Sequence, residues 1–330
     1  MKILYVLVSS DKDFYAEQAL VSMMSARKLM PECYISLLLD SDTAKTLIGQ
    51  RALIRDYVNE FKELDIDSSY TPMQKSRYLK TSMRSHIAGD FLYVDVDTVF
   101  AEALDHSDFD KELMAVPDCH TAIESHPIKN WIDKTARHLS FKIDSLWHFN
   151  SGVLFAKDSP SVHDFFEEWH RLWLYSVSKG VFIDQPALNM ANENKKEMMC
   201  ICKPFYNAQV LWSIRYLSRA KIIHYFSSLC QMNREFPYLF SKKLFWEQIK
   251  KEGFKEEVLE SIYNPKEAFE PSTLLLGAKD FKFLNSEAIL YIETLYKSPH
   301  FYARFLLKLN TWILRFLFKF YNVFYQKFLK

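Results

Sequence analysis

The stretch DFLYVDVDTVF, Asp90–Phe100, decides both the fold class and the chemistry expected of this chain. It is apolar apart from three aspartates and a threonine, which is typical of a strand buried in a sheet. Side chains two residues apart on a strand point the same way, so Asp95 and Asp97 are expected to lie together, with Val96 opposite. Two adjacent carboxylates repel each other unless a cation neutralises them. Oxygen ligands suit Mg²⁺ or Mn²⁺, and the stretch therefore predicts a divalent-cation site on a core strand.

Strands and helices are expected to alternate on both sides of this stretch. Such alternation is typical of an α/β domain with a mostly parallel sheet. The predicted strands cover 2–8, 34–39, 58–64, 150–156 and 221–226, and the predicted helices cover 15–29, 78–87 and 162–176.

Glycine is scarce in this chain, and its distribution excludes some nucleotide-binding classes. The six glycines are all isolated, so no GxGxxG motif and no Walker-type loop can be written from them. A bound nucleotide diphosphate would have to be neutralised by a metal ion and basic side chains rather than by a backbone cradle. This pattern disfavours dinucleotide oxidoreductases and P-loop kinases.

Several motifs occur in an order that resembles the family 8 glycosyltransferases, retaining enzymes that include glycogenin and bacterial lipopolysaccharide galactosyl- and glucosyltransferases. The resemblance covers roughly residues 1–230. It implies a GT-A-type nucleotide-sugar-binding domain over 1–230. Beyond this domain, the charged and helical pattern of the sequence itself predicts a helical extension over 231–297. The matching segments are Asp13-Phe14-Tyr15-Ala16, Lys80, Asp95-Val96-Asp97, Phe149–Leu154 (FNSGVL), Asp184-Gln185 with Leu188-Asn189, and His224.

The resemblance also implies roles for these residues. The residues that it assigns to the nucleotide-sugar donor are Ser9, Asp13, Tyr15, Lys80, Asp95, Val96 and Asp97. The implied ligands of Mn²⁺ or Mg²⁺ are Asp95, Asp97 and His224, and the implied catalytic residues are Asn150, Asp184 and Gln185. A UDP-linked hexose is the expected donor, and a glycan or lipid-linked molecule is the expected acceptor. Nucleic acid is not expected as a partner.

The segment after His224 departs from the family pattern. The family commonly has a glycine and a Lys-Pro-Trp there, whose lysine grips the diphosphate, whereas this chain has Tyr225–Cys230, YFSSLC. The phosphate lysine is therefore missing. The candidates to replace it are basic residues that precede the DxD, namely Lys75, Arg77, Lys80 and Arg84.

The C-terminal segment 298–330 predicts a helix attached to a membrane surface. Of the 42 basic residues, seven follow Glu293, the last acidic residue, which leaves 35 basic against 41 acidic residues in the rest of the chain. An acidic body with a basic tail favours an anionic surface as partner. We therefore expect a cytoplasmic protein attached peripherally to the inner face of the cytoplasmic membrane.

The spacing of polar residues in this tail supports that expectation. A helix would gather them into one narrow stripe on an otherwise apolar surface. A buried helix needs fewer basic residues, and a membrane-spanning helix would not be interrupted by them. A helix that lies in the headgroup plane of an anionic membrane needs both the basic residues and the apolar surface. The alternative is packing of the tail on the domain or on a second subunit. The polar residues are Arg304, Lys308, Thr311, Arg315, Lys319, Asn322, Gln326 and Lys330.

Two other functions are compatible with parts of the sequence. The string FLYVDVDTVF also fits the first motif of haloacid-dehalogenase-like phosphatases, in which Asp95 would be the nucleophile and Asp97 the general acid. That motif usually opens its domain and needs a later acidic pair, but here no Asp-Asp pair follows it. A catalytically silent, membrane-binding relative is the second alternative, against which the intact DxD, DQ and histidine motifs count.

Overall fold

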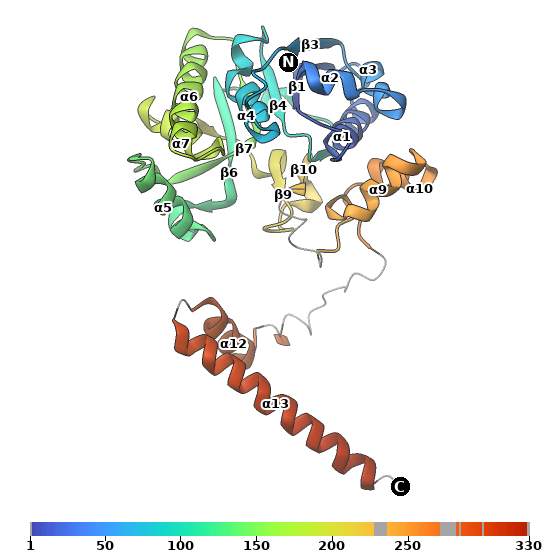
Figure 1. Cartoon of the computed structure of the whole chain (residues 1–330), viewed down its shortest axis with the longest axis vertical. Helices are drawn as coiled ribbons and strands as arrows, with labels where there is room; N and C mark the ends of the chain where they lie inside the picture. The colour runs from blue at the N-terminus through green and yellow to red at the C-terminus, as the bar shows by residue number, and fades with distance from the viewer. Residues whose placement is uncertain (1, 228–235, 271–281, 284, 299, 329–330) are drawn as a thin grey trace. The chain divides into compact units, whose positions relative to one another are not determined.

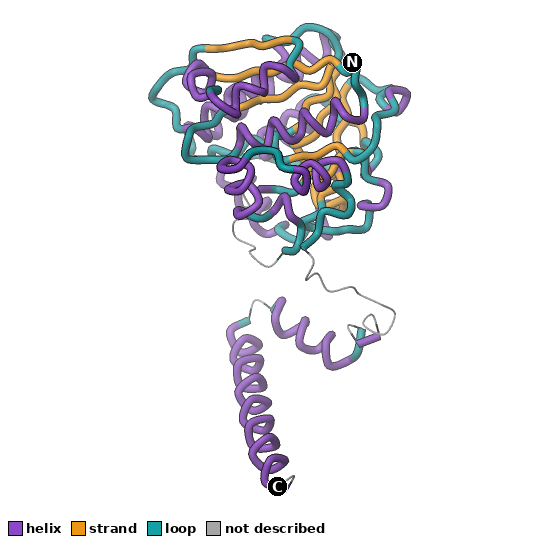
Figure 2. Tube along the Cα trace, turned by 90° about the vertical axis from the view of Figure 1, so that its right-hand side faces the viewer, coloured by secondary structure: helices purple, strands orange, loops and turns teal. Residues whose placement is uncertain are grey.

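The computed structural model describes residues 2–227, 236–270, 282–283, 285–298 and 300–328. The chain forms two compact units, Met1–Pro271 and Ser272–Lys330. Figure 2 shows the strands gathered in the first unit, while the described part of the second unit is helical. The extension expected over 231–297 is divided between them, with α9 (Lys243–Glu252) and α10 (Glu256–Tyr263) in the first unit and α12 (Glu287–Lys297) in the second.

The first unit is built on a seven-stranded, mostly parallel sheet, which confirms the predicted α/β fold class. The pairs β4–β7 and β6–β7 are antiparallel, and the other neighbouring pairs are parallel. The strands, in spatial order, are β3 (Glu60–Leu64), β2 (Tyr34–Asp40), β1 (Lys2–Leu7), β4 (Phe91–Val94), β7 (Trp147–Ala156), β6 (Leu113–Ala122) and β8 (Cys200–Ile201).

Helices cover both faces of this sheet, and two apolar cores form between the layers (Figure 1). Alternation along β1 sends Ile3 and Tyr5 into one core and Leu4 and Val6 into the other. Because both faces are buried, the central strands appear in the sequence as continuous apolar runs. The first core packs against α1 (Tyr15–Leu29), and the second packs against α4 (Pro72–Ser82), α6 (Pro160–Ser178) and α7 (Gln185–Asn194).

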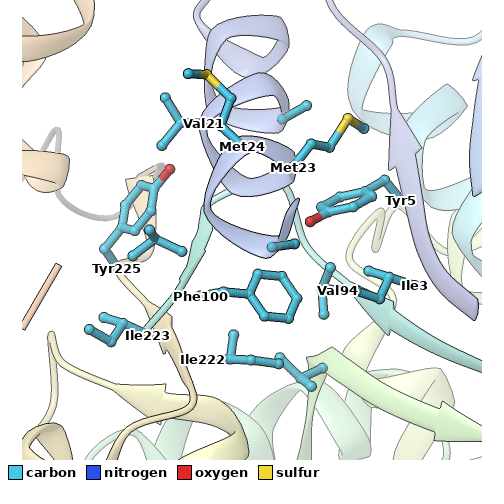
Figure 3. Packing of buried hydrophobic residues seen from close by; sticks show 14 of the residues in the cluster. Ile3, Tyr5, Val21, Met23, Met24, Val94, Phe100, Ile222, Ile223 and Tyr225 are labelled. Carbon is cyan, nitrogen blue, oxygen red and sulfur yellow. The ribbon is translucent and has the colours of Figure 1, made fainter. Parts of the chain in front are cut away.

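A second sheet of three strands interrupts the single strand predicted over 90–100. Its order is β5 (Thr98–Phe100), β10 (Ile222–His224) and β9 (Ala208–Gln209). The chain leaves the main sheet after Val94, and the Thr98 hydroxyl donates to the Asp95 carbonyl at 2.8 Å, which closes the turn between the sheets. Phe100 is then buried beneath α1, between Val94 and Ile222 (Figure 3).

Other elements differ from the prediction for local reasons. Helix α4 begins six residues earlier than expected, because Thr71 and Gln74 form a reciprocal capping box and Pro72 occupies the first turn. Strand β6 contains a proline and a bulge, and α7 carries four asparagine or glutamine residues, so neither shows a clear period in the sequence. The short helices α2 (Ser41–Thr46), α3 (Ile54–Tyr57) and α5 (Lys129–His138) complete the first unit's α-helices in the described residues.

The second unit contains α12 and α13 (Phe301–Phe328), and α13 forms a 28-residue helix over most of the predicted tail. Its exposed side chains include the basic Lys308 and Arg315 and the aromatic Trp312 and Phe316. Within the residues that the structure describes, no helix has the length and apolarity to cross a membrane.

Candidate active site

The fold brings Asp95, Asp97 and His224 together where the two sheets meet. Each side chain offers one ligand atom, and these atoms all lie within 4.8 Å of one another. Asp95 follows β4, Asp97 precedes β5, and His224 ends β10 directly opposite Thr98. The His224 Nε2 atom lies 3.4 Å from the Asp97 Oδ1 atom. Two carboxylates and an imidazole in this arrangement can hold a divalent cation.

A glycine on β7 makes room for this cluster. A Cβ atom added at Gly152 would lie 2.4 Å from His224 Cε1 and 2.9 Å from Asp95 Oδ2, distances that real Cβ atoms do not adopt. The backbone approaches closely as well, since the Asp95 N–H donates to the Gly152 carbonyl at 2.7 Å. The His224 ring also stacks on Phe226, with ring centroids 3.9 Å apart. The FNSGVL segment therefore needs a glycine at this position because a Cβ atom would overlap His224 and Asp95.

Helix α4 delivers two cations to the acidic cluster. Lys80, whose side chain is 1% exposed, donates to Asp95 Oδ1 at 2.9 Å and to Ser151 Oγ at 3.1 Å. The Arg77 Nε atom lies 2.9 Å from Asp184 Oδ1, and Lys80 Nζ lies 3.5 Å from Asp184 Oδ2. Residues three apart share one face of a helix, so α4 presents both charges to the same site.

The surroundings keep two of the buried carboxylates ionised. Burial alone would raise the pKa of Asp97, but the charge and hydrogen bond of His224, together with the Ser227 N–H, hold this pKa below its ordinary value. Burial would likewise raise the pKa of Asp184, and the two cations on α4 outweigh that effect. Asp184 therefore carries a negative charge at neutral pH.

A further carboxylate, Asp118 in β6, was not identified from the sequence. Its Oδ1 accepts from Asn150 Nδ2 at 2.9 Å, and its Oδ2 accepts from Gln185 Nε2 at 3.0 Å. It also faces His126 Nε2 at 3.2 Å. The two residues after Asp118 adopt left-handed φ values of 55° and 53° and shift the register with β7, and such a bulge re-aims a side chain. Asp118 thus joins two of the three residues that the sequence assigns to catalysis.

The charges of this site fit a divalent cation. Burial opposes ionisation of Asp118, but hydrogen bonds from His126 and Asn150 hold its pKa below the ordinary value. Four carboxylates then face the two cations of α4, so acidic groups outnumber these basic groups at the site. These acids are Asp95, Asp97, Asp118 and Asp184, and the cations are Arg77 and Lys80.

Asp184 and Gln185 are held against β7 by the rest of their motif. Asp184 is the residue before α7, and its carbonyl accepts from Trp169 Nε1 at 3.2 Å. One turn into the helix, Asn189 Oδ1 accepts from the Phe149 N–H at 2.7 Å, and Asn189 Nδ2 donates to the Gln185 carbonyl at 2.9 Å. The separated DQ and FNSGVL segments therefore form one continuous hydrogen-bonded unit.

The structure distinguishes the four candidates for the missing phosphate lysine. Lys75 Nζ donates to two carboxylates next to β2, at 2.6 and 3.1 Å. Arg84 is 1% exposed, donates to backbone carbonyls and lies over the Phe91 ring. Arg77 and Lys80 remain, since both lie at the acidic cluster.

The loop before α1 carries Ser9 and Asp13, two of the residues assigned to the nucleotide-sugar donor. Asp13 Oδ1 accepts from Ser9 Oγ at 2.6 Å and from the Tyr15 N–H at 3.1 Å, while its Oδ2 accepts from the N–H and hydroxyl of Ser10. These four donors fill the acceptor positions of the carboxylate, so Asp13 shapes the loop in this conformation. For Asp13 to contact the base of a bound nucleotide, one of these four hydrogen bonds has to be replaced by a hydrogen bond to that base.

Two other residues assigned to the donor have different surroundings. Tyr15 is 36% exposed, and burial followed by the charge of Asp97 raises the pKa of its phenol. Tyr15 therefore lies in the field of the acidic cluster. The Val96 side chain is partly buried against the first core.

Comparison with known proteins places the chain in a family. The profile of the nucleotide-diphospho-sugar transferases matches residues 38–243, while no curated protein shows a significant match. Mouse xyloside xylosyltransferase 1 is similar in structure at 14% identity and a TM-score of 0.47, over 69% of this chain and 98% of that chain. The galactosyltransferase LgtC, in complex with donor and acceptor sugar analogues, is similar at 17% identity and a TM-score of 0.46, over 68% of this chain and 87% of that chain. The family match spans more than half of the sequence and includes every site residue from Lys80 to His224, and the chain therefore belongs to the nucleotide-diphospho-sugar transferase family and is a glycosyltransferase.

Proposed function

We propose that this glycosyltransferase transfers a hexose from a UDP-linked donor to a glycan or lipid-linked acceptor, with retention of configuration and with the help of Mn²⁺ or Mg²⁺. The cluster of Asp95, Asp97 and His224 carries this proposal, because it offers a divalent-cation site within the segment that matches the family. The resemblance to family 8 supports retention and the UDP-linked donor.

The residues around this cluster have separate parts in the proposal. When held by the cluster, a divalent cation neutralises the diphosphate and supplies Lewis acidity toward the leaving nucleotide. Arg77 and Lys80 add positive charge for the phosphates. Asp184 is kept ionised and stabilises the positive charge that develops at the anomeric carbon as its bond to the diphosphate oxygen of the leaving nucleotide breaks. Asn150 and Gln185, both held by Asp118, orient the sugar.

Incubation with Mn²⁺ and the matching nucleotide sugar is expected to release the nucleoside diphosphate. Release should be slow without acceptor, because water then replaces the acceptor hydroxyl, and faster once the acceptor is present. Chromatography of a panel of UDP-, GDP- and ADP-linked hexoses measures it. Rapid cleavage of a generic phosphomonoester that is lost in Asp95→Asn would instead establish the phosphatase alternative, and failure to bind any donor would establish the silent relative.

The second unit supports a membrane location for this activity. Helix α13 combines exposed basic side chains with exposed aromatic ones. Each lysine or arginine close to an anionic surface contributes about 1 kcal/mol of binding free energy, to which burial of the apolar face is added. We infer peripheral attachment to the inner face of the cytoplasmic membrane, where a lipid-linked acceptor is concentrated beside the enzyme.

A chain truncated before Phe301 is expected to lose binding to anionic vesicles while it still hydrolyses the donor. The full-length chain should co-sediment with anionic vesicles, and should do so less with neutral vesicles or at high salt, because its stripe of charges is screened. The matched control is Lys308→Glu with Arg315→Glu in the full-length chain, which reverses two charges and keeps the apolar face. Equal sedimentation of full-length and truncated chains would assign the tail to packing or dimerisation.

A further inference from the structure

A buried chain of hydrogen bonds joins the metal-site histidine to the residues assigned to the sugar. Asn207 is fully buried at the end of the short helix Pro204–Asn207. Its Nδ2 donates to Asn150 Oδ1 at 3.0 Å, and its Oδ1 lies 3.2 Å from His224 Nδ1. Asn150 in turn donates from Nδ2 to Asp118 Oδ1 at 2.9 Å.

The carboxylate at one end of this chain fixes the direction of every bond in it. An ionised carboxylate only accepts, so Asn150 must turn its NH₂ group toward Asp118 and its carbonyl oxygen away. That oxygen accepts from the Gly152 N–H at 2.9 Å and from Asn207 Nδ2. Asn207 must then present its own carbonyl oxygen to His224, and an amide oxygen also only accepts.

We propose that Asn207 is a positioning residue for the metal site, which holds the His224 ring with its proton on Nδ1. With this proton kept on Nδ1, Nε2 is the nitrogen left to a bound cation, 3.4 Å from Asp97 Oδ1. A metal ligand requires a neutral imidazole with such a free nitrogen lone pair. The same side chain braces Asn150, so Asn207 connects the metal ligand with the residues that orient the sugar. This inference rests on the proposed metal-assisted function.

The backbone at Asn207 is anchored independently of its amide side chain. The Asn207 carbonyl contacts His120 Nε2 at 2.8 Å. Two residues earlier, the Phe205 carbonyl accepts from the Lys221 N–H at 2.8 Å. Substitutions at Asn207 therefore change the hydrogen bonds of the side chain while these backbone contacts remain, and the two side-chain bonds can be removed separately.

The proposal can be tested without measuring activity. The full-length protein is titrated with Mn²⁺, and the electron paramagnetic resonance signal of free Mn²⁺ is monitored during the titration. Asn207→Ala is expected to weaken Mn²⁺ binding by on the order of 10- to 100-fold, because the loss of a hydrogen-bond partner of a metal-bound histidine has effects of that size. Asn207→Asp keeps an acceptor for His224 and removes the donor to Asn150. Its Mn²⁺ affinity should stay within about 3-fold of the parent while kcat falls, and this split separates positioning from general destabilisation.

Nitrogen-15 spectra of the histidines in the Mg²⁺-saturated protein provide the direct observation, because the bound cation then occupies Nε2 and leaves the ring proton to Nδ1. His224 is expected as the Nδ1–H tautomer in the parent and as the Nε2–H tautomer or a mixture in Asn207→Ala. An Nε2–H tautomer in the parent, or unchanged Mn²⁺ affinity in Asn207→Ala when His224→Ala loses it, would overturn the inference. Unchanged affinity in His224→Ala would instead show that the proposed metal site itself is wrong.

Discussion

Asp97→Ala is expected to reduce sugar transfer by about 10³-fold, because it removes one ligand of the proposed metal site. Asp97 Oδ1 faces His224 Nε2, and Asp97 Oδ2 accepts from the Ser227 N–H at 2.9 Å. Substitution therefore removes both a candidate ligand atom and the acceptor that holds the next segment. The ratio kcat/KM at saturating Mn²⁺ measures the loss.

A second substitution separates these two effects. Asp97→Asn keeps an acceptor for the Ser227 N–H but removes the negative charge, so a loss of similar size would assign the effect to the metal. Asp110→Ala is the matched control, since Asp110 is exposed and pairs only with the neighbouring Lys111 among the ion pairs of the described residues. Excess chelator should reproduce the Asp97→Ala phenotype in the parent protein. Full activity under chelation would remove the metal from the mechanism.

The main sheet could be predicted because its strands are buried on both faces. Strands β1, β2 and β4 are apolar over nearly their whole length, and their pattern in the sequence needs no information from distant residues. The division of the stretch 90–100 between two sheets could not be predicted in this way. It depends on pairing of β5 with β10, more than a hundred residues away, and no local pattern encodes that partner.

The same distinction, between local patterns and contacts with distant residues, applies to the candidate site. Asp95, Asp97 and His224 were identifiable because they lie in short motifs with a recognisable order. Asp118 and Asn207 were missed because neither belongs to one of the motifs identified in the sequence, and their importance comes from bonds to residues 32 and 57 positions away. A buried, isolated aspartate after the apolar run LMAV is the one local signal that could have indicated Asp118.

The sequence identifies Gly152 as part of the FNSGVL segment, and the structure explains why this position must be glycine. A methyl group there would overlap the His224 ring, with 2.4 Å to Cε1 and 2.9 Å to Nδ1. The ring cannot retreat without losing its stack on Phe226 or its bond to Asn207. Overpacking of this kind costs about 1–3 kcal/mol of folding free energy when the surroundings must shift.

Gly152→Ala is therefore expected to lower kcat/KM by about 10²-fold and to weaken Mn²⁺ binding, since it displaces His224, a proposed ligand, together with the bond of this ring to Asn207. Gly180→Ala is the matched control, because a Cβ there meets no atom within 4 Å and only the left-handed φ of 79° is strained. That control should lower stability by about 1 kcal/mol and leave Mn²⁺ affinity unchanged. A double-mutant cycle identifies the clash: in a His224→Ala background, Gly152→Ala should add less destabilisation than in the parent, because only the 2.9 Å contact with Asp95 Oδ2 then remains. Additive losses in the two variants would mean that Gly152 acts through Asp95 rather than through the space that it leaves for His224.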